Sequence, residues 1–250
     1  MPERPILSPL GHAVLQVIDM GKPSIGIIGK GNVGSALEQG LSNAGYEVRT
    51  SGHEPDEVRD VGAWGDLLIL AVPYGERSNA LQSLGDAVQG KTLVDVTNAV
   101  EDGIGFAGSL EQSGAEELQD QADGANVVKA FNTVFANQMA KGHTQGNPLT
   151  VFVAGDDPQA KKEAAELGEA VGFEVVDAGE LRNARWLEPL GYLNMQIANV
   201  TGKNNGGFHF VQPGTSSART TKRQGQRPKS GAGGATSSRR RQPMPARRQR

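Results

Sequence analysis

Short runs of apolar residues alternate along this chain with segments whose apolar residues recur every three or four positions. The first run, at 24–28, has no polar alternation, which predicts a β-strand buried on both faces. Beyond a glycine-rich turn, apolar residues recur at helical spacing from Val33 until Gly45, a residue typical of helix C-termini. A second strand is expected at 47–50, so this part of the sequence predicts a strand–turn–helix–strand unit.

The same alternation continues as far as residue 200. Further strands are expected at 66–72, 91–96, 125–130, 149–154 and 173–177, and helices at 76–88, 109–123, 156–171 and 181–200. The last helix offers a series of apolar side chains for packing: Leu181, Trp186, Leu187, Leu190, Leu193, Ile197 and Val200. Continuously apolar strands separated by helices predict an α/β fold. We expect a doubly wound, mainly parallel Rossmann-type sheet with a short C-terminal helical part.

Charge divides the chain near residue 210. Of the 25 Lys and Arg residues, 11 lie in 211–250, where there is no acid, which leaves 14 against all 28 acidic residues in 1–210. Residues 212–250 also lack Leu, Ile, Val, Phe, Tyr and Trp, so we expect a disordered basic tail. The tail has no aromatic residue for base stacking. We therefore expect non-specific binding of polyanions at most, and no specific nucleic-acid partner.

Several classes of protein are excluded by what the sequence lacks. It has no cysteine, which excludes a disulfide scaffold, thiolate metal ligands and a cysteine nucleophile. The four histidines, at positions 12, 53, 143 and 209, form no evident catalytic or metal-binding set, so we expect no metal site. The sequence shows neither a secretory signal nor the roughly 18 consecutive apolar residues of a membrane helix, so we expect a cytoplasmic location.

The strongest chemical signal is a G-x-G-x-x-G motif, which consists of Gly29, Lys30, Gly31, Asn32, Val33 and Gly34. It follows a predicted strand and opens a predicted helix, the context in which this motif holds a dinucleotide. Gly29 permits the tight turn, Gly31 lets the backbone approach a pyrophosphate, and Gly34 lets helix and strand pack closely. The helix N-terminus then offers free N–H groups to the anion.

The end of the second strand bears on the choice between NAD and NADP. NAD sites usually place Asp or Glu there to bind the ribose hydroxyls. Here the strand end is followed by Gly52 and His53, and Glu54 is the nearest following acid. Without an acid to repel a 2′-phosphate, and with Thr50, Ser51 and His53 available as donors, we expect NADP rather than NAD.

The carboxyl ends of other strands should meet at the same crevice. Asn98 and Asn132 follow two of these strands and could orient a carboxamide or a ring carbonyl, although asparagine is also common as a turn residue. The sequence assigns no catalytic residue. Hydride transfer between two bound cofactors needs chiefly proximity and orientation, so it is compatible with few acids and bases.

Five motifs in order, at 27–34, 71–74, 94–98, 128–133 and 177–185, resemble the NADPH-dependent coenzyme F420 reductases and their dinucleotide-binding relatives. The resemblance covers about residues 24–205 and implies a Rossmann domain with a small C-terminal helical part, usually dimeric. It also implies site residues. These are Lys30, Gly31, Asn32 and Val33 at the pyrophosphate, Gly52 and His53 at the 2′-phosphate, and Val72, Asn98, Val100 and Ala136 along the ribose and nicotinamide.

Two departures from the family pattern bear on function. The chain has Gly52-His53 where the reductases carry Ser-Arg, and residues 132–135 lack their proline-containing turn and preceding histidine. We therefore expect an NADPH-dependent oxidoreductase whose electron acceptor is either coenzyme F420 or a flavin. The alternative is a non-catalytic, dinucleotide-sensing regulatory protein.

The expected organisation follows from these signals. We predict a leader arm at 1–22, an NAD(P)-binding Rossmann-type domain with a C-terminal helix at 23–205, and the basic tail at 211–250. The expected partners are a small-molecule redox cofactor and a second copy of the chain, without a membrane.

Overall fold

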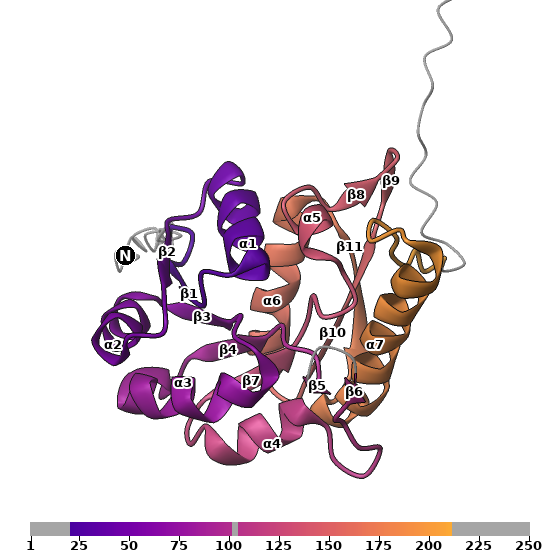
Figure 1. Ribbon diagram of the computed structural model, residues 1–250. Coiled ribbons are helices and arrows are strands. Elements are labelled where there is room, and N and C mark those ends of the chain that lie inside the picture. Colours follow the sequence, from indigo (N-terminus) through magenta and orange to yellow (C-terminus); the bar gives the residue numbers. More distant parts are fainter. Residues whose placement is uncertain (1–20, 102–104, 212–250) are drawn as a thin grey trace, which may run out of the picture. The chain divides into compact units, whose positions relative to one another are not determined.

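A computed structural model describes residues 21–101 and 105–211 of the protein (Figure 1). The leader arm expected at 1–22 lies outside the described residues except for its last two positions. The basic tail expected at 211–250 lies outside them except for Val211.

All the strands that the apolar runs predict are present in one seven-stranded sheet of order β11-β10-β7-β4-β3-β1-β2. Their bounds are β1 Ile25–Ile28, β2 Val48–Ser51, β3 Leu67–Leu70, β4 Thr92–Asp95, β7 Asn126–Lys129, β10 Thr150–Gly155 and β11 Glu174–Gly179. The pairs from β2 to β7 are parallel. The prediction of a doubly wound, mainly parallel α/β sheet is therefore confirmed.

The last two strands run in the opposite direction, because β10 pairs with β7 antiparallel and β11 pairs with β10 in parallel. The connection from β7 to β10 contains only the short helix α5 (Ala136–Met139) and a hairpin of β8 (His143–Thr144) and β9 (Asn147–Pro148). A four-residue helix spans about 6 Å and cannot carry the chain back along the sheet. The chain therefore re-enters the sheet from the same end at which β7 leaves it.

Helices cover both faces of the sheet, and Figure 1 shows α1 and α6 together on one side. The longer helices are α1 Asn32–Asn43, α2 Pro55–Trp64, α3 Arg77–Leu84, α4 Gly114–Gln121, α6 Pro158–Val171 and α7 Ala184–Thr201. One core cluster includes Leu37 of α1 and Leu167 of α6. A second cluster on the other face includes Val58 of α2, Leu84 of α3 and Leu118 of α4.

Short elements complete the fold. They are the 3-10 turns η1 Tyr74–Glu76, η2 Gly85–Val88 and η3 Leu181–Asn183, and the strands β5 Val100–Glu101 and β6 Gly105–Phe106.

Several helices differ from the sequence-based expectation. The helix expected at 76–88 ends at Leu84 and continues as the 3-10 turn η2, and the helix expected at 181–200 begins with the 3-10 turn η3. Helix α2 is not among the predicted helices; Val58 and Val61 are its only buried apolar side chains among the described residues. The helix expected at 109–123 begins only at Gly114, because Ser113 caps it: its side chain accepts from the Glu116 N–H while Glu116 reaches back to the Ser113 N–H.

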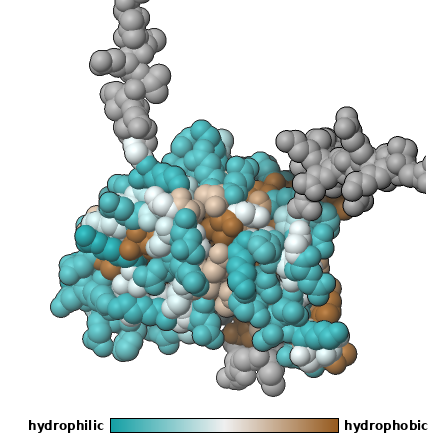
Figure 2. Space-filling model, turned by 90° about the horizontal axis from the view of Figure 1, so that it is seen from above, coloured by the Kyte–Doolittle hydropathy of each residue, from teal (hydrophilic) through white to brown (hydrophobic). Residues whose placement is uncertain are grey.

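Helix α7 has a buried face and an exposed apolar face. Leu187 is buried, as is Leu181 in the preceding turn η3. Trp186, Leu193, Ile197 and Val200 are largely exposed; we call these four residues the exposed apolar face of α7. Hydrophilic residues dominate the view in Figure 2, where apolar residues are confined to separate patches.

The turn between β1 and α1 depends on close backbone contact. A Cβ atom added at Gly34 would lie 1.9 Å from the carbonyl oxygen of Gly29. Gly34 thus allows α1 to pack directly against the end of β1, as the motif predicts.

Replacing Gly34 by alanine should destabilise the protein by about 1–3 kcal/mol, because the added methyl group has no room. Helix propensity alone would give the opposite sign, a gain of about 1 kcal/mol. Urea unfolding followed by circular dichroism measures the difference. The control is Ser35→Ala in the same helical turn, where we expect a change within about 0.5 kcal/mol. An unchanged or increased stability of Gly34→Ala would contradict this packing.

Candidate functional site

The crevice of the sheet lies between β1 and β3. From β1 the chain passes through α1 to β2 on one side, and from β2 through α2 to β3 on the other. At this switch point Gly29 has a φ of +120°, and a Cβ atom there would lie 2.3 Å from the carbonyl oxygen of Ala71. The Gly29 N–H donates to Ser51 and the Ala71 N–H to Ile28, which fixes the turn against both neighbouring strands.

The N-terminus of α1 is open. Its N-cap is Gly31, no side chain of the described residues caps it, and its first turn contains no acid. A Cβ atom added at Gly31 would meet no heavy atom of the described structure within 4 Å. By contrast, Ser113 caps α4 and Asp157 caps α6. The first N–H groups of α1 are therefore accessible to an external anion.

Two cavities flank this turn. The first has a volume of about 770 Å³. It is lined by residues at the start of α2, by residues on one face of α3, and by Gly29, Lys30, Gly31, Gly52 and His53. The second, of about 730 Å³, is lined by residues after β3, β4 and β7 and by one face of α7. Ala71, Val72 and Pro73 line both. We call them the β2-side cavity and the α7-side cavity.

The residues that the sequence singles out gather in these two cavities. Gly29, Lys30, Gly31, Gly52 and His53 line the β2-side cavity, and Val72 lines both. Asn32, Val33, Asn98, Val100 and Ala136 line the α7-side cavity.

Two of the expected residues lie elsewhere. Gly34 is buried beneath the turn, where it serves packing. The side chain of Ser51 is fully buried, and its hydroxyl has no hydrogen-bond partner among the described residues. The expectation that Ser51 donates to a bound phosphate therefore does not fit this arrangement, because its side chain does not reach the surface of the cavity.

Several residues of the α7-side cavity were not expected. Gly191, Asn194 and Met195 of α7 line it, as does Thr97. The Thr97 hydroxyl, like that of Ser51, is buried and has no hydrogen-bond partner among the described residues. A glycine, an asparagine and a methionine in a long amphipathic helix carry no local signal for a site, which is why sequence reasoning missed them.

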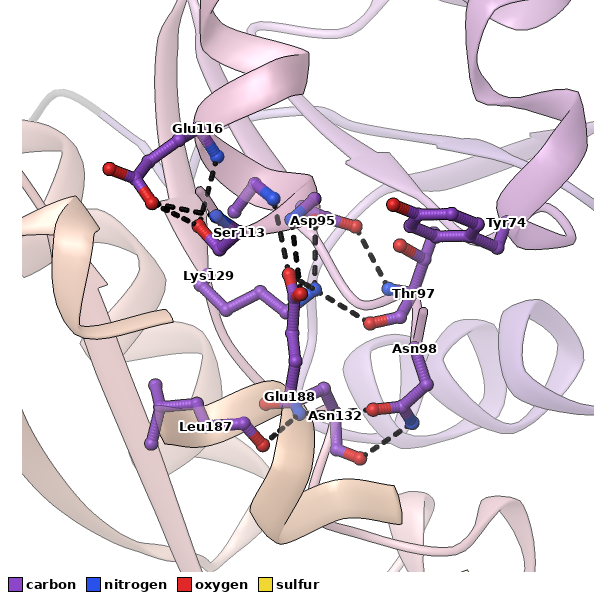
Figure 3. A network of polar contacts seen from close by, with 12 residues as sticks. Tyr74, Asp95, Thr97, Asn98, Ser113, Glu116, Lys129, Asn132, Leu187 and Glu188 are labelled. Carbon is purple, nitrogen blue, oxygen red and sulfur yellow. Dashed lines mark hydrogen bonds and ion pairs between the residues drawn. The ribbon is translucent and has the colours of Figure 1, made fainter. Parts of the chain in front are cut away.

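Asn98 and Asn132 contact each other rather than standing free (Figure 3). The Asn98 amide donates to the Asn132 carbonyl at 2.8 Å, and the Asn132 amide donates to Asn98 Oδ1 at 3.1 Å and to the Leu187 carbonyl at 2.7 Å. A Cβ atom on Gly191 would lie 2.5 Å from Asn98 Oδ1. The pair thus joins the strand ends to α7 and shapes the wall of the cavity.

A buried ion cluster lies behind this wall (Figure 3). Lys129 Nζ lies 2.9 Å from Asp95 Oδ2 and 3.2 Å from Glu188 Oε1, and it donates to the Thr97 carbonyl at 2.7 Å. Glu188 also accepts the N–H groups of Gly114 and Ala115 at the start of α4. All three charged side chains are at most 1% exposed. The cluster connects β4, β7, α4 and α7.

Two further polar contacts hold the same region together. The Arg185 guanidinium binds both carboxylate oxygens of Glu116 and, with the Ser113 hydrogen bonds, lowers the pKa of Glu116 to about 2. Burial raises the pKa of Tyr74, at the mouth of the α7-side cavity, to about 12, and its hydroxyl donates to Glu117. Tyr74 is therefore neutral at physiological pH.

A carboxylate does reach the end of β2, contrary to the sequence-based expectation. Glu57, in the first turn of α2, accepts the Gly52 N–H at 2.6 Å and forms an ion pair with Lys30. The sequence suggested no acid at this position because Glu57 comes from the next element, which the apolar pattern did not predict.

Other kinds of site have little support in the described part of the chain. Residues 21–101 and 105–211 contain no group of three or more metal-ligating side chains. None of the helices within those ranges is long and apolar enough to cross a membrane.

The fold and the crevice define the class: a Rossmann-type α/β protein with an open helix N-terminus at the switch point of its sheet. Residues 24–64, from β1 to α2, match the family model described as NADP oxidoreductase coenzyme F420-dependent. A solved structure from Arthrobacter sp. FB24, which bears the name of an F420-dependent NADP reductase, has 26% identity and a TM-score of 0.70. It covers 76% of this chain and 100% of that one.

Two curated relatives extend the comparison. The F420-dependent NADP reductase of Methanothermobacter thermautotrophicus is 31% identical over 152 residues, 56% of this chain and 64% of the relative. The metalloreductase STEAP3 of Rattus norvegicus is 31% identical over 182 residues, 67% of this chain and 36% of the relative. The chain thus spans less than two thirds of either relative. Together these matches confirm the resemblance to the F420-dependent NADP reductases that the motifs indicate.

The buried cluster predicts an order of stability for two variants. Lys129→Met leaves the Asp95 and Glu188 carboxylates buried without their cation, so we expect a loss of about 3–5 kcal/mol in the free energy of unfolding. Glu188→Gln keeps the balanced pair of Lys129 and Asp95, so we expect a smaller loss, about 1–3 kcal/mol. Urea unfolding at neutral pH gives both values. The reverse order would contradict the assigned role of Lys129.

Proposed function

We propose that the protein is an NADP-dependent oxidoreductase that binds NADP(H) across the switch point of its sheet. The observation that carries this proposal is the open N-terminus of α1 at Gly31, between two cavities of the size that ligand sites usually have, about 300–1,000 Å³. In this arrangement the pyrophosphate lies against the N–H groups of residues 31–33, the adenosine lies in the β2-side cavity, and the nicotinamide lies in the α7-side cavity.

The second substrate in this proposal is a deazaflavin such as coenzyme F420, or a flavin. A third cavity, of about 580 Å³, shares Asn32, Phe135 and Ala136 with the α7-side cavity, so there is room for another group beside the nicotinamide. The names of the matching family and of the Methanothermobacter relative support the deazaflavin.

The lining of the α7-side cavity suits a reaction governed by orientation. Of the described residues that line it, Tyr74 is the only titratable one, and its high pKa and its hydrogen bond to Glu117 make it a poor base. When bound, the nicotinamide supplies the hydride, and the protein's task is to position it and the acceptor. The same lining leaves a dinucleotide-sensing regulatory protein as the competing function.

An assay of NADPH oxidation with coenzyme F420, flavin mononucleotide and a ferric chelate separates the two functions. We expect NADPH to be consumed with the deazaflavin or the flavin. Tight NADPH binding without turnover by any acceptor would overturn the enzymatic proposal, and a partner protein whose affinity differs between NADP and NADPH would then favour the regulatory one.

Gly31→Ala tests the placement of the pyrophosphate. The added methyl group has open space in the protein, so the only expected loss of stability is the roughly 1 kcal/mol by which alanine is a poorer N-cap residue than glycine. It would stand where the pyrophosphate approaches, so we expect the Kd for NADPH to rise by about tenfold or more. Isothermal titration calorimetry measures the Kd for NADPH of the wild-type protein and of Gly31→Ala. Gly21→Ala, also in open space but outside the cavities, is the control. Unchanged NADPH affinity in Gly31→Ala would contradict the placement.

The proposed assembly is a homodimer, supported by the exposed apolar face of α7. Trp186 is 63% exposed and Val200 87%, which is unusual for large apolar side chains clustered on one helix. Sedimentation equilibrium should show a dimer that Leu193→Glu converts to a monomer. Asn199→Glu adds the same charge elsewhere on α7 and should leave the dimer intact. A monomeric wild-type protein would refute the homodimer.

The cytoplasmic location stays a prediction from the sequence.

A further inference from the structure

The carboxylate of Glu57 occupies the two inner donors of the β2-side cavity. Its Oε2 accepts the Gly52 N–H at 2.6 Å, and its Oε1 is paired with Lys30 Nζ. Both Lys30 and Gly52 line the cavity. One ammonium group and one backbone N–H, which converge on the end of β2, form an anion-binding pair that is filled by a side chain of the protein itself.

The other charged groups nearby are turned to different partners. His53 is 96% exposed at its side chain, and its Nε2 lies 3.1 Å from Glu54 Oε1. Asp56 pairs with Arg59 one turn along α2. Of these acidic side chains, Glu57 is therefore the one that competes for the donors at the strand end.

The two nicotinamide dinucleotides place opposite demands on this carboxylate. A ribose 2′-hydroxyl of NAD(H) can donate a hydrogen bond to it, as acidic residues at this strand end usually accept one. A 2′-phosphate of NADP(H) cannot donate and carries negative charge, so it is repelled by a carboxylate and attracted by Lys30. The phosphate can use Lys30 and Gly52 only after Glu57 has left them.

We propose that Glu57 is a specificity-determining residue, whose carboxylate stands in for the 2′-phosphate in the free protein and must move aside when NADP(H) binds. With NAD(H) the carboxylate stays in place. This inference rests on the proposed function, because it assumes that the adenosine ribose lies in the β2-side cavity. Glu57 has room to move, since 39% of its side chain is exposed.

The charge that this competition requires is present at neutral pH. The hydrogen bonds from Lys30 and from the Gly52 N–H hold the pKa of Glu57 below its usual value. The side chain is therefore ionised throughout the physiological range, and the wild-type protein meets a 2′-phosphate with the full negative charge.

Binding titrations of NADPH and NADH to the full chain test the proposal. Glu57→Gln keeps the size of the side chain and removes its charge. We expect the Kd for NADPH to fall relative to that for NADH, so that the ratio of the two constants moves toward NADPH by about tenfold. Asp56→Asn changes the net charge equally in the same helical turn, and we expect it to leave the ratio within about twofold of the wild type.

A second variant and a salt series test whether the effect of Glu57 is electrostatic. Lys30→Met should weaken NADPH binding more than NADH binding, and the gain in Glu57→Gln should shrink at high salt, because both effects are electrostatic. A ratio that Glu57→Gln leaves unchanged, or that Asp56→Asn shifts as much, would overturn the role of Glu57 while the proposed function stands. A wild-type chain that binds neither dinucleotide would overturn both.

Discussion

The buried ammonium group of Lys129 is the constraint on which the rest of the site depends. A charge without access to water needs partners, and Lys129 finds Asp95 on the adjacent strand and Glu188 on α7. Glu188 in turn binds the start of α4. Because these contacts hold α7 against the carboxyl ends of β4 and β7, Gly191 can approach the Asn98–Asn132 pair and Asn194 can line the cavity.

The site also shows how local charge differs from the average. The part of the chain before residue 211 carries an excess of acid, yet the first turn of α1 has none and the N–H groups there are open. At the end of β2 the local cation, Lys30, is already paired with Glu57. The turn therefore leaves its N–H donors free for an anion, whereas the cation at the strand end already has a carboxylate partner.

Much of this arrangement could be predicted from the sequence, because the signals were local. Apolar runs located each strand, and the glycine motif located the turn at the switch point. Asp95 and Lys129 were within reach as well: each is a charged residue inside an apolar strand, and they are direct partners in the register of β4 and β7. Predicting that Asp95 and Lys129 are neighbours required the strand order, which the sequence alone did not provide.

The missed features depend on tertiary placement. Glu57 reaches back to Gly52 from the first turn of α2, a helix that was not predicted from the sequence. Glu188 and Gly191 gain their roles only because α7 packs over the strand ends. The reversal of β10 and β11 follows from a connection whose helix proved too short to cross the sheet.

The most direct test of the account is amide NMR of the labelled protein during titration with NADPH. If the pyrophosphate lies at the start of α1, the N–H resonances of Gly31, Asn32 and Val33 should move most, together with Val72 between the two cavities. Saturable binding that leaves these amides unmoved would show that the dinucleotide does not bind at the start of α1.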